Sequence, residues 1–367
     1  MKIFFILFLT FINKTLFING FLHKNNINKK LYYGDIYTEL KKSSFITKPY
    51  ILYNSVQNNN QPKTNLNIDP KLISIFHEKK RGFLQIIRYK NILPTFLLFF
   101  SGGWIINPSL ISLFSNIYFI ISSINTILIM STSMIINDLF DIEIDKINYP
   151  TRPLITGLVT KWEAVLYIVF LLSITQFLSI HFLSDNLQFI MNISIFSLLI
   201  YTPIFKRILF MKNIFCASLV SFSLFVGGIS STNKLIELNK NFDVFSISLS
   251  VIFLSSLYSE LLLDIRDYEG DKTNNIITIP VFFGKENAWI LASIILIYNI
   301  ISNTFSLMYI RDINTGVILS FIFVPIIKDL YDIQSMRFSK ESIIKAINNA
   351  YIKPYLILLL FLCSLSR

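Results

Sequence analysis

The chain has 367 residues, of which 53% are hydrophobic and only 15% are charged. Soluble domains carry about 25% charged residues, so this composition indicates a membrane protein. The net charge of +11 comes from residues 1–90, which hold 15 Lys and Arg against four Asp and Glu. A nucleic-acid-binding protein needs a basic face on its folded domain, so this distribution excludes that class.

The first 80 residues have the composition of a leader. Lys2 precedes an apolar run from Ile3 to Ile12, which is the outline of a signal peptide. The sequence that follows is rich in Asn and Lys and poor in acid, as organelle transit peptides are. We therefore expect residues 1–80 to be a signal- or transit-like leader with a disordered linker, and residues 81–367 to form the transmembrane domain. A plastid-like organelle is the expected location, with the mitochondrial inner membrane and a plain signal anchor as alternatives.

From about residue 83 the apolar runs are each near 20 residues long, which is enough to cross a bilayer. We predict an all-α, polytopic membrane bundle of about nine transmembrane helices around a central cavity capped by polar loops. The predicted spans begin near Asn91, Ser109, Trp162, Leu187, Asn213, Asp243, Ala288, Asn314 and Lys353. The last span is short, and the run from Asn314 is interrupted by Pro325.

The connections after the second, fourth, sixth and eighth spans share one side of the membrane and carry most of the Lys and Arg. The opposite connections between residues 137 and 353 hold only Lys234, Lys240 and Arg311. Because positively charged loops stay on the cytoplasmic side, this asymmetry places the basic face toward the cytosol, stroma or matrix.

Two aspartate triplets of identical spacing lie on that basic face, each at the end of an apolar run. The first motif is Asp138, Asp141 and Asp145, and the second motif is Asp264, Asp267 and Asp271. On a helix, positions i, i+3 and i+7 share one face, so each motif can direct three carboxylates at one point. Carboxylates near hydrocarbon are costly and mark functional sites. Oxygen ligands of this kind suit Mg²⁺, which would bring a substrate diphosphate with it.

The strings NDLFDIEIDK at residues 137–146, NYPTRP at 148–153 and DIRDYEGDK at 264–272 resemble the aspartate-rich motifs of the intramembrane aromatic prenyltransferase (UbiA-type) superfamily. The resemblance covers residues 80–365. It implies that the six motif aspartates are catalytic and bind Mg²⁺ against the diphosphate of a polyprenyl donor. Asn137 matches the family's asparagine beside the first motif.

Several further residues are candidates for binding substrate. Basic donors would stabilise the diphosphate leaving group electrostatically. Tyr201 and Lys206 resemble the family's Tyr/Lys element with one extra residue between them, which leaves open whether Lys206 or Arg207 meets the phosphate. The substrate-binding candidates are Asn91, Asn137, Arg152, Tyr201, Lys206, Arg207 and Lys272. The basic members can equally be read as ordinary anchors on the cytoplasmic side. Glu260, one turn before Asp264, is either a base toward the acceptor or the partner of Arg266.

The sequence after the second motif resembles the branch that holds chlorophyll synthases, homogentisate prenyltransferases and geranylgeranylglyceryl phosphate enzymes. We expect Mg²⁺-dependent transfer of a polyprenyl group to a lipophilic acceptor, with an aromatic ring on a quinone or tocopherol-like route preferred. A glycerol-phosphate or chlorophyllide-type acceptor remains open. A cation-coupled transporter is the alternative from another class, but its acids would lie near mid-membrane. The partners are therefore a polyprenyl diphosphate, the acceptor and the bilayer.

Overall fold

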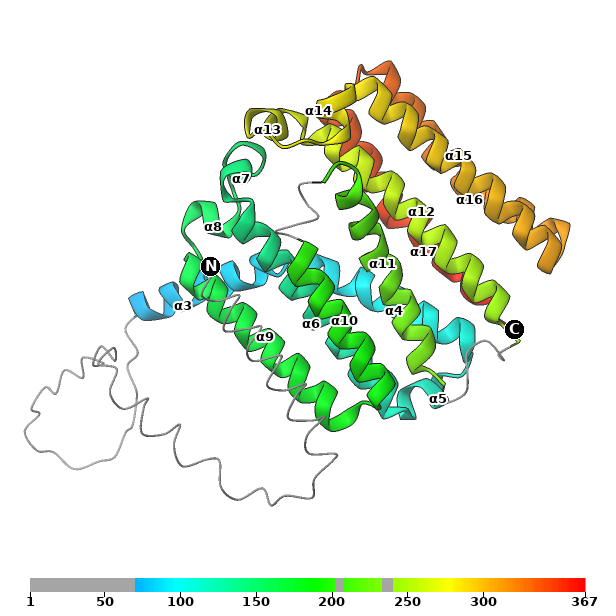
Figure 1. Cartoon of the computed structure of the whole chain (residues 1–367), viewed down its shortest axis with the longest axis horizontal. Coiled ribbons are helices and arrows are strands. Elements are labelled where there is room, and N and C mark those ends of the chain that lie inside the picture. The colour runs from blue at the N-terminus through cyan, green and yellow to red at the C-terminus, as the bar shows by residue number, and fades with distance from the viewer. Residues whose placement is uncertain (1–69, 202–207, 233–239, 367) are drawn as a thin grey trace, which may run out of the picture. The chain divides into compact units, whose positions relative to one another are not determined.

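The computed structural model describes residues 70–201, 208–232 and 240–366. The chain divides into two compact units after residue 66, and every described residue belongs to the second unit. Within these ranges all regular elements are helices (Figure 1). The expected all-helical membrane bundle is confirmed. Residues 1–69 of the predicted leader, together with Lys206 and Arg207, lie outside the described residues.

The bundle is built from nine apolar helices in the described part of the chain. Seven of them are long and apolar enough to cross a membrane, while α4 has 15 residues and α10 has 17. The nine helices are α4 (Ile92–Ile106), α6 (Ile117–Phe140), α9 (Lys161–Phe182), α10 (Asp185–Tyr201), α11 (Met211–Ser230), α12 (Phe242–Arg266), α15 (Lys285–Ile310), α16 (Ile313–Ser335) and α17 (Lys340–Ser364).

Helix α3 (Pro70–Ile86) and η1 (Tyr89–Asn91) precede α4. Short helices lie in the connections that follow, namely α5 (Leu110–Ser115), α7 (Ile142–Asn148), α8 (Pro153–Thr156), α13 (Tyr268–Thr273) and α14 (Ile279–Phe283). Figure 1 shows α7, α8, α13 and α14 at one end of the bundle and α5 at the other. Helix α7 follows α6 and packs against α13, which follows α12. The two predicted motifs therefore meet at the same end.

Three predicted span boundaries differ from the structure. The last span begins at Lys340 instead of near Lys353, and Pro325 and Pro354 both lie inside helices. The predicted connection from Asp329 to Asn349 shrinks to a tight turn at Arg337 and Phe338, which both have positive φ. The run from Ser109 forms α5 and then α6, with Asn116 capping α6 through its side chain. Proline does not end these membrane helices, because neighbouring helices can satisfy the backbone groups that it leaves without a hydrogen bond.

Glycine pairs bring α4 and α11 into close contact. A Cβ on Gly102 would lie 1.9 Å from the carbonyl oxygen of Leu224, and one on Gly227 would lie 1.9 Å from that of Phe99. No larger residue fits at either position, so the backbones meet directly, as small residues allow in membrane bundles. Gly102 and Gly227 are therefore packing residues.

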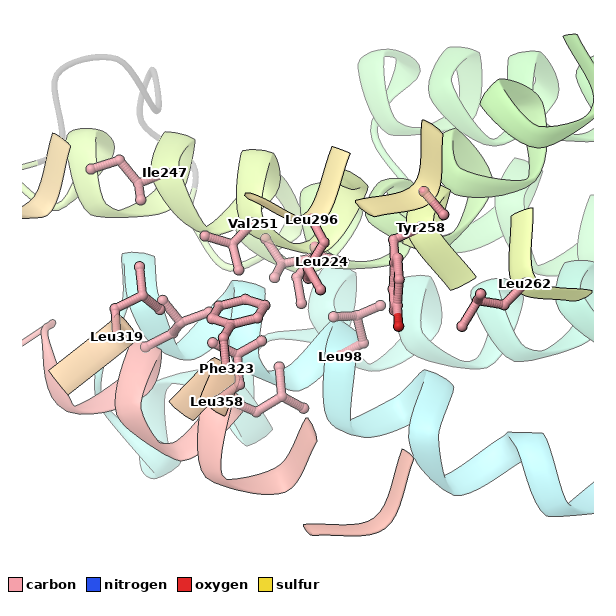
Figure 2. Packing of buried hydrophobic residues seen from close by; sticks show 14 of the residues in the cluster. Leu98, Leu224, Ile247, Val251, Tyr258, Leu262, Leu296, Leu319, Phe323 and Leu358 are labelled. Atoms are coloured by element: carbon pink, nitrogen blue, oxygen red, sulfur yellow. The ribbon is translucent and has the colours of Figure 1, made fainter. Parts of the chain in front are cut away.

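Helix α12 lies at the centre of the main apolar core. It packs against α4, α11, α15 and α17. Figure 2 shows Val251 and Tyr258 of α12 facing Leu98, Leu296 and Phe323 from three other helices. This packing holds the end of α12, and thus the second motif, in a defined position.

Candidate active site

Each motif straddles a break between a long helix and a short one. Asp138 lies in the last turn of α6, Asp141 is the residue between α6 and α7, and Asp145 lies in α7. The second motif repeats this arrangement, because Asp267 separates α12 from α13. Each motif thus begins on a long helix and ends on a short one. The hydrogen bond from the Asp145 amide to the Asp141 carbonyl keeps the helical spacing across the first break.

The motif carboxylates are withdrawn from solvent. Five of the six aspartates are buried, and Asp264 is only 1% exposed; Asp267 is half-buried. An ionised carboxylate in such surroundings loses several kcal/mol of hydration unless it is paired or hydrogen-bonded. The buried aspartates are Asp138, Asp141, Asp145, Asp264 and Asp271.

Two arginines hold the first motif. Arg88, just before η1, donates to the Asp138 carboxylate at 2.9 Å, and Arg152 donates to the same oxygen at 3.0 Å. Arg152 also pairs with Asp145, so one guanidinium bridges two carboxylates. Arg152 extends from the start of α8, where Pro153 at the first helical position sets the direction of the chain. Arg152 therefore lies beside the first motif, and its binding of substrate stays a prediction.

Charge accumulates at the first motif despite these arginines. Burial raises the pKa of Asp145 to about 6, with Arg152 opposing the shift and the neighbouring Asp141 and Asp138 adding to it. A divalent cation would relieve the same crowding of negative charge. The first motif thus has the electrostatics of a cation site.

The second motif is held from a different helix. Lys212 donates to one Asp264 oxygen at 2.6 Å, and Asn213 donates to the other at 2.7 Å. Both donors lie in the first turn of α11. Arg266 binds Asp267 through two hydrogen bonds of 2.8 and 2.9 Å. Arg266 takes Asp267 as its bidentate partner, because the neighbouring carboxylate matches the planar guanidinium, and it also interacts with Glu260 through charge.

The two motifs are joined through Asn148 and Tyr149. The Tyr149 hydroxyl donates to Asp267 at 2.8 Å, and burial together with Asp267 raises the pKa of this phenol. A Cβ on Gly270 would lie 2.3 Å from Asn148 Nδ2, so α7 and α13 can approach only because residue 270 is glycine. The guanidinium of Arg152 lies 4.3 Å from the centroid of the Tyr149 ring. The segment NYPTRP therefore acts as the bridge between the motifs.

The remaining predicted site residues are scattered around this centre. Asn137 is half-buried in the last turn of α6, and Tyr201 is buried at the end of α10, with its hydroxyl 3.1 Å from Cys216 Sγ. Lys272 is exposed, with its ammonium 5.5 Å from the Tyr268 ring centroid. Asn91 is exposed where η1 meets α4, in a hollow beside Arg88.

Sequence reasoning did not assign Lys212, Asn213, Asn148 or Tyr149 to the site. By its sequence Lys212 is one more positively charged residue of the cytoplasmic side, and Asn213 is the residue at which a predicted span begins. The available signal was a Lys-Asn pair at the start of an apolar run on the same side of the membrane as both motifs. Only the packing of α11 on α12 shows that this pair meets Asp264.

The donor set fits Mg²⁺. In the described part of the chain, no three His, Cys, Asp or Glu side chains stand close enough to hold a metal ion by themselves. Mg²⁺ keeps several waters and takes one or two carboxylates together with substrate phosphate oxygens, so it needs no complete protein cage. The buried oxygens of the two motifs, gathered at one end of the bundle, are the hard ligands that such an ion requires.

Comparison with known proteins identifies the family of the chain. The model of the UbiA prenyltransferase family matches residues 92–345. Digeranylgeranylglyceryl phosphate synthase of Sulfurisphaera tokodaii is 29% identical over 282 residues, which cover 75% of this chain and 94% of the relative. The enzyme of the same name from Sulfolobus acidocaldarius is 30% identical over 59% of this chain and 74% of its own length.

Two solved structures share the fold. A structure described as digeranylgeranylglyceryl phosphate synthase in membranes superposes with a TM-score of 0.58 at 24% identity, over 79% of this chain and 99% of its own. A UbiA homolog from Archaeoglobus fulgidus, bound to DMAPP and Mg²⁺, superposes with a TM-score of 0.57 at 20% identity, over 78% of this chain and 97% of its own.

Proposed function

Because the chain belongs to the UbiA prenyltransferase family, we propose that it transfers a geranylgeranyl group from its diphosphate to geranylgeranylglyceryl phosphate, with Mg²⁺ at the two motifs. Prenyl transfer itself follows from the family, and the cation-coupled transporter is thereby excluded. The choice of acceptor is supported by the alignment of the chain with curated digeranylgeranylglyceryl phosphate synthases, which covers 74 to 94% of their length. This evidence favours the glycerol-phosphate alternative over the aromatic acceptor that the sequence had suggested.

The relatives also bear on the location of the protein. It is an integral membrane protein by its apolar helices and its family. The aligned relatives are archaeal lipid synthases and lend no support to a plastid, a mitochondrion or quinone synthesis. The uneven distribution of Lys and Arg still supports the proposal that the motifs face the cytosol-like side of the membrane.

The residues of the site suit the departure of a diphosphate. Mg²⁺ bound to the motifs would neutralise the diphosphate and favour cleavage of the allylic carbon–oxygen bond. Asp138 and Asp145 of the first motif, with Asp264 and Asp271 of the second, would hold the metal. Arg152 and Lys212 already stand beside these carboxylates and carry the positive charge that the leaving diphosphate needs. Such preorganised charge acts strongly in a site that excludes water.

The acceptor then completes the reaction. The name of the related enzymes implies a product with two geranylgeranyl groups on one glycerol, so the acceptor carries one group and offers a free glycerol hydroxyl. The hydroxyl oxygen forms the new ether bond to the allylic carbon as the carbon–oxygen bond to diphosphate breaks. The hydroxyl proton leaves to the released diphosphate or to water. No external oxidant or reductant is required.

The decisive experiment offers one donor with several acceptors. The full chain, purified in detergent, is incubated with geranylgeranyl diphosphate, Mg²⁺ and either geranylgeranylglyceryl phosphate, homogentisate, 4-hydroxybenzoate or chlorophyllide. We expect diphosphate release and a doubly prenylated product with the first acceptor alone. Chelation of Mg²⁺ should abolish the release.

The controls separate the acceptor from the chemistry. Asp138→Ala should abolish turnover, while Lys328→Ala, at an exposed position of α16, should leave it unchanged. Turnover with homogentisate and none with the glycerol phosphate would reject the proposed acceptor and restore the aromatic one.

A further inference from the structure

A basic hollow of about 820 Å³ lies beside the first motif, on α3 and η1. Its charged lining residues are Lys80, Arg81, Arg88 and Lys90, with His77 at one edge. Among the described residues that line it, none is acidic. A concave surface with three exposed cations, and with Arg88 paired to Asp138 at its edge toward the motif, concentrates positive potential and attracts an anion of high charge density.

The orientation of α3 explains why these cations face outward. Lys79 binds Glu163 at the start of α9, with both carboxylate oxygens at 2.8 Å. Phe83 packs edge-on against Tyr167 with ring centroids 5.2 Å apart, and a Cβ on Gly82 would lie 3.0 Å from Val159. This face of α3 is therefore fixed to the bundle, and the adjacent Lys80 and Arg81 are exposed.

The hollow is continuous with the active site through Arg88. This arginine lines the hollow and donates to Asp138 at 2.9 Å. Arg88 has a left-handed backbone, with φ of 50°, which is uncommon for a residue other than glycine. Asn91, one of the predicted substrate-binding residues, lines the same hollow. An anion bound there would thus lie next to the first motif.

The surroundings indicate that the anion belongs to a lipid. Leu84 and Tyr89 line the hollow and are 42% and 49% exposed, so it offers apolar and aromatic surface beside its cations. Arg and Lys bind phosphate through charge-assisted hydrogen bonds, and Tyr favours the membrane interface. A phosphate monoester on a prenylated glycerol matches both features.

We propose that this basic hollow binds the phosphate of the lipid acceptor, and so selects a phosphorylated acceptor over a neutral one. The proposal rests on the proposed function and deepens it, since it assigns acceptor recognition to α3 and η1 and leaves the diphosphate of the donor to the motifs. Lys80, Arg81 and Lys90 are then specificity-determining residues that contact neither the motif carboxylates nor the donor.

The test compares two acceptors and two variants. Geranylgeranylglyceryl phosphate and its dephosphorylated alcohol are offered to the full chain, to Lys80→Glu/Arg81→Glu, and to the matched control Lys161→Glu. Lys161 is exposed at the start of α9 and does not line the hollow. Equilibrium binding of each acceptor is measured by calorimetry without donor and without Mg²⁺, and KM is measured for both substrates with Mg²⁺.

For the wild type and the control we expect the phosphorylated acceptor to bind about tenfold or more tightly than the alcohol, since hydrogen bonds to a charged group are stronger than those to a neutral one. In the double variant this preference should disappear, while the KM for geranylgeranyl diphosphate stays the same. Lys90→Glu should show the same change in smaller degree, and it replaces the double variant if that protein fails to fold.

Other outcomes overturn the proposal in distinct ways. Unchanged preference for the phosphorylated acceptor in both hollow variants would reject it, while turnover with that acceptor would leave the proposed function intact. Absence of turnover with every acceptor would instead reject the proposed function. The hollow variants can also be compared in phosphatidylcholine vesicles with and without phosphatidylglycerol. If they lose binding of both acceptors equally, and only when phosphatidylglycerol is present, the hollow binds bulk anionic lipid and the proposal is rejected.

Discussion

The two motifs have the same sequence spacing and the same helix break but are neutralised in different ways. The first motif is held by arginines from connections outside the long helices, Arg88 and Arg152, which are 33% and 18% exposed. The second motif is held at Asp264 by Lys212 and Asn213 from the first turn of α11, and Asp264 is 1% exposed. The first motif is thus neutralised by two arginines, one of which binds two carboxylates, whereas Asp264 of the second motif is bound by one lysine and one neutral amide.

This difference separates catalysis from stability. Loss of a carboxylate from either motif removes a metal ligand in the proposed mechanism. At the first motif Arg152 keeps its ion pair with Asp145 when the Asp138 carboxylate is lost, and Arg88 is 33% exposed to water. At the second motif Lys212 loses the carboxylate that it binds, and a largely buried charge without its counter-ion destabilises strongly. The two motifs should therefore respond alike in activity and unequally in stability.

The largest effect is expected from the first aspartate of each motif. Asp138→Asn and Asp264→Asn should each lower kcat by about a hundredfold or more, the scale of losing one preorganised electrostatic group. Asp264→Asn should also destabilise the protein by about 3 kcal/mol, because Lys212 loses the carboxylate that it binds, whereas Asp138→Asn should cost less, because Arg152 still pairs with Asp145. Thermal unfolding in detergent and steady-state kinetics measure the two quantities. Equal loss of stability would contradict the comparison.

A double substitution sharpens the same contrast. Lys212→Met combined with Asp264→Asn removes both charges and should recover most of the stability lost in Asp264→Asn, since an apolar replacement of a buried pair is often neutral. Activity should remain low, because the carboxylate is still absent. Recovery of activity in the double variant would show that Asp264 serves only to neutralise Lys212.

The bridge between the motifs can be broken sterically. Gly270→Ala places a Cβ within 2.6 Å of three atoms of Asn148 and should force α7 and α13 apart. We expect a loss of about 1–3 kcal/mol of stability from overpacking, together with reduced kcat. Asn148→Ala/Gly270→Ala removes the clash and should restore part of both. If Gly270→Ala alone has full activity, the spacing of the two short helices does not matter for turnover.

The smallest effect is expected at the hydrogen bond between the motifs. Tyr149→Phe keeps the ring beneath Arg152 but removes the hydroxyl that donates to Asp267. Arg266 still holds this carboxylate, so the cost should be about 1 kcal/mol, or about fivefold in kcat/KM. Tyr149→Leu removes the ring as well and should be worse than Tyr149→Phe. Identical kinetics for the two variants would show that the aromatic face contributes nothing.

Much of the architecture follows from local sequence. Apolar length alone indicates helices that cross a bilayer, because every backbone polar group in hydrocarbon must be satisfied within its own segment. Both motifs are expected on one side of the membrane because an even number of predicted spans separates them, and the distribution of Lys and Arg agrees with this. The requirement for glycine at Gly102 and Gly227 could likewise be anticipated, since small residues in apolar runs mark close helix packing.

The partners of the carboxylates were decided by tertiary structure. Arg88 meets Asp138 across 50 residues of sequence, and Lys212 meets Asp264 across 52. No periodicity connects such residues, because their proximity depends on how α11 packs on α12 and how α3 and η1 lie beside α6. The same holds for the helix breaks at Asp141 and Asp267, which regular spacing did not reveal. Sequence thus determined which charges exist and on which side of the membrane they lie. Packing between distant segments decided which charges meet, because ion-pair geometry is set by contacts that local sequence does not encode.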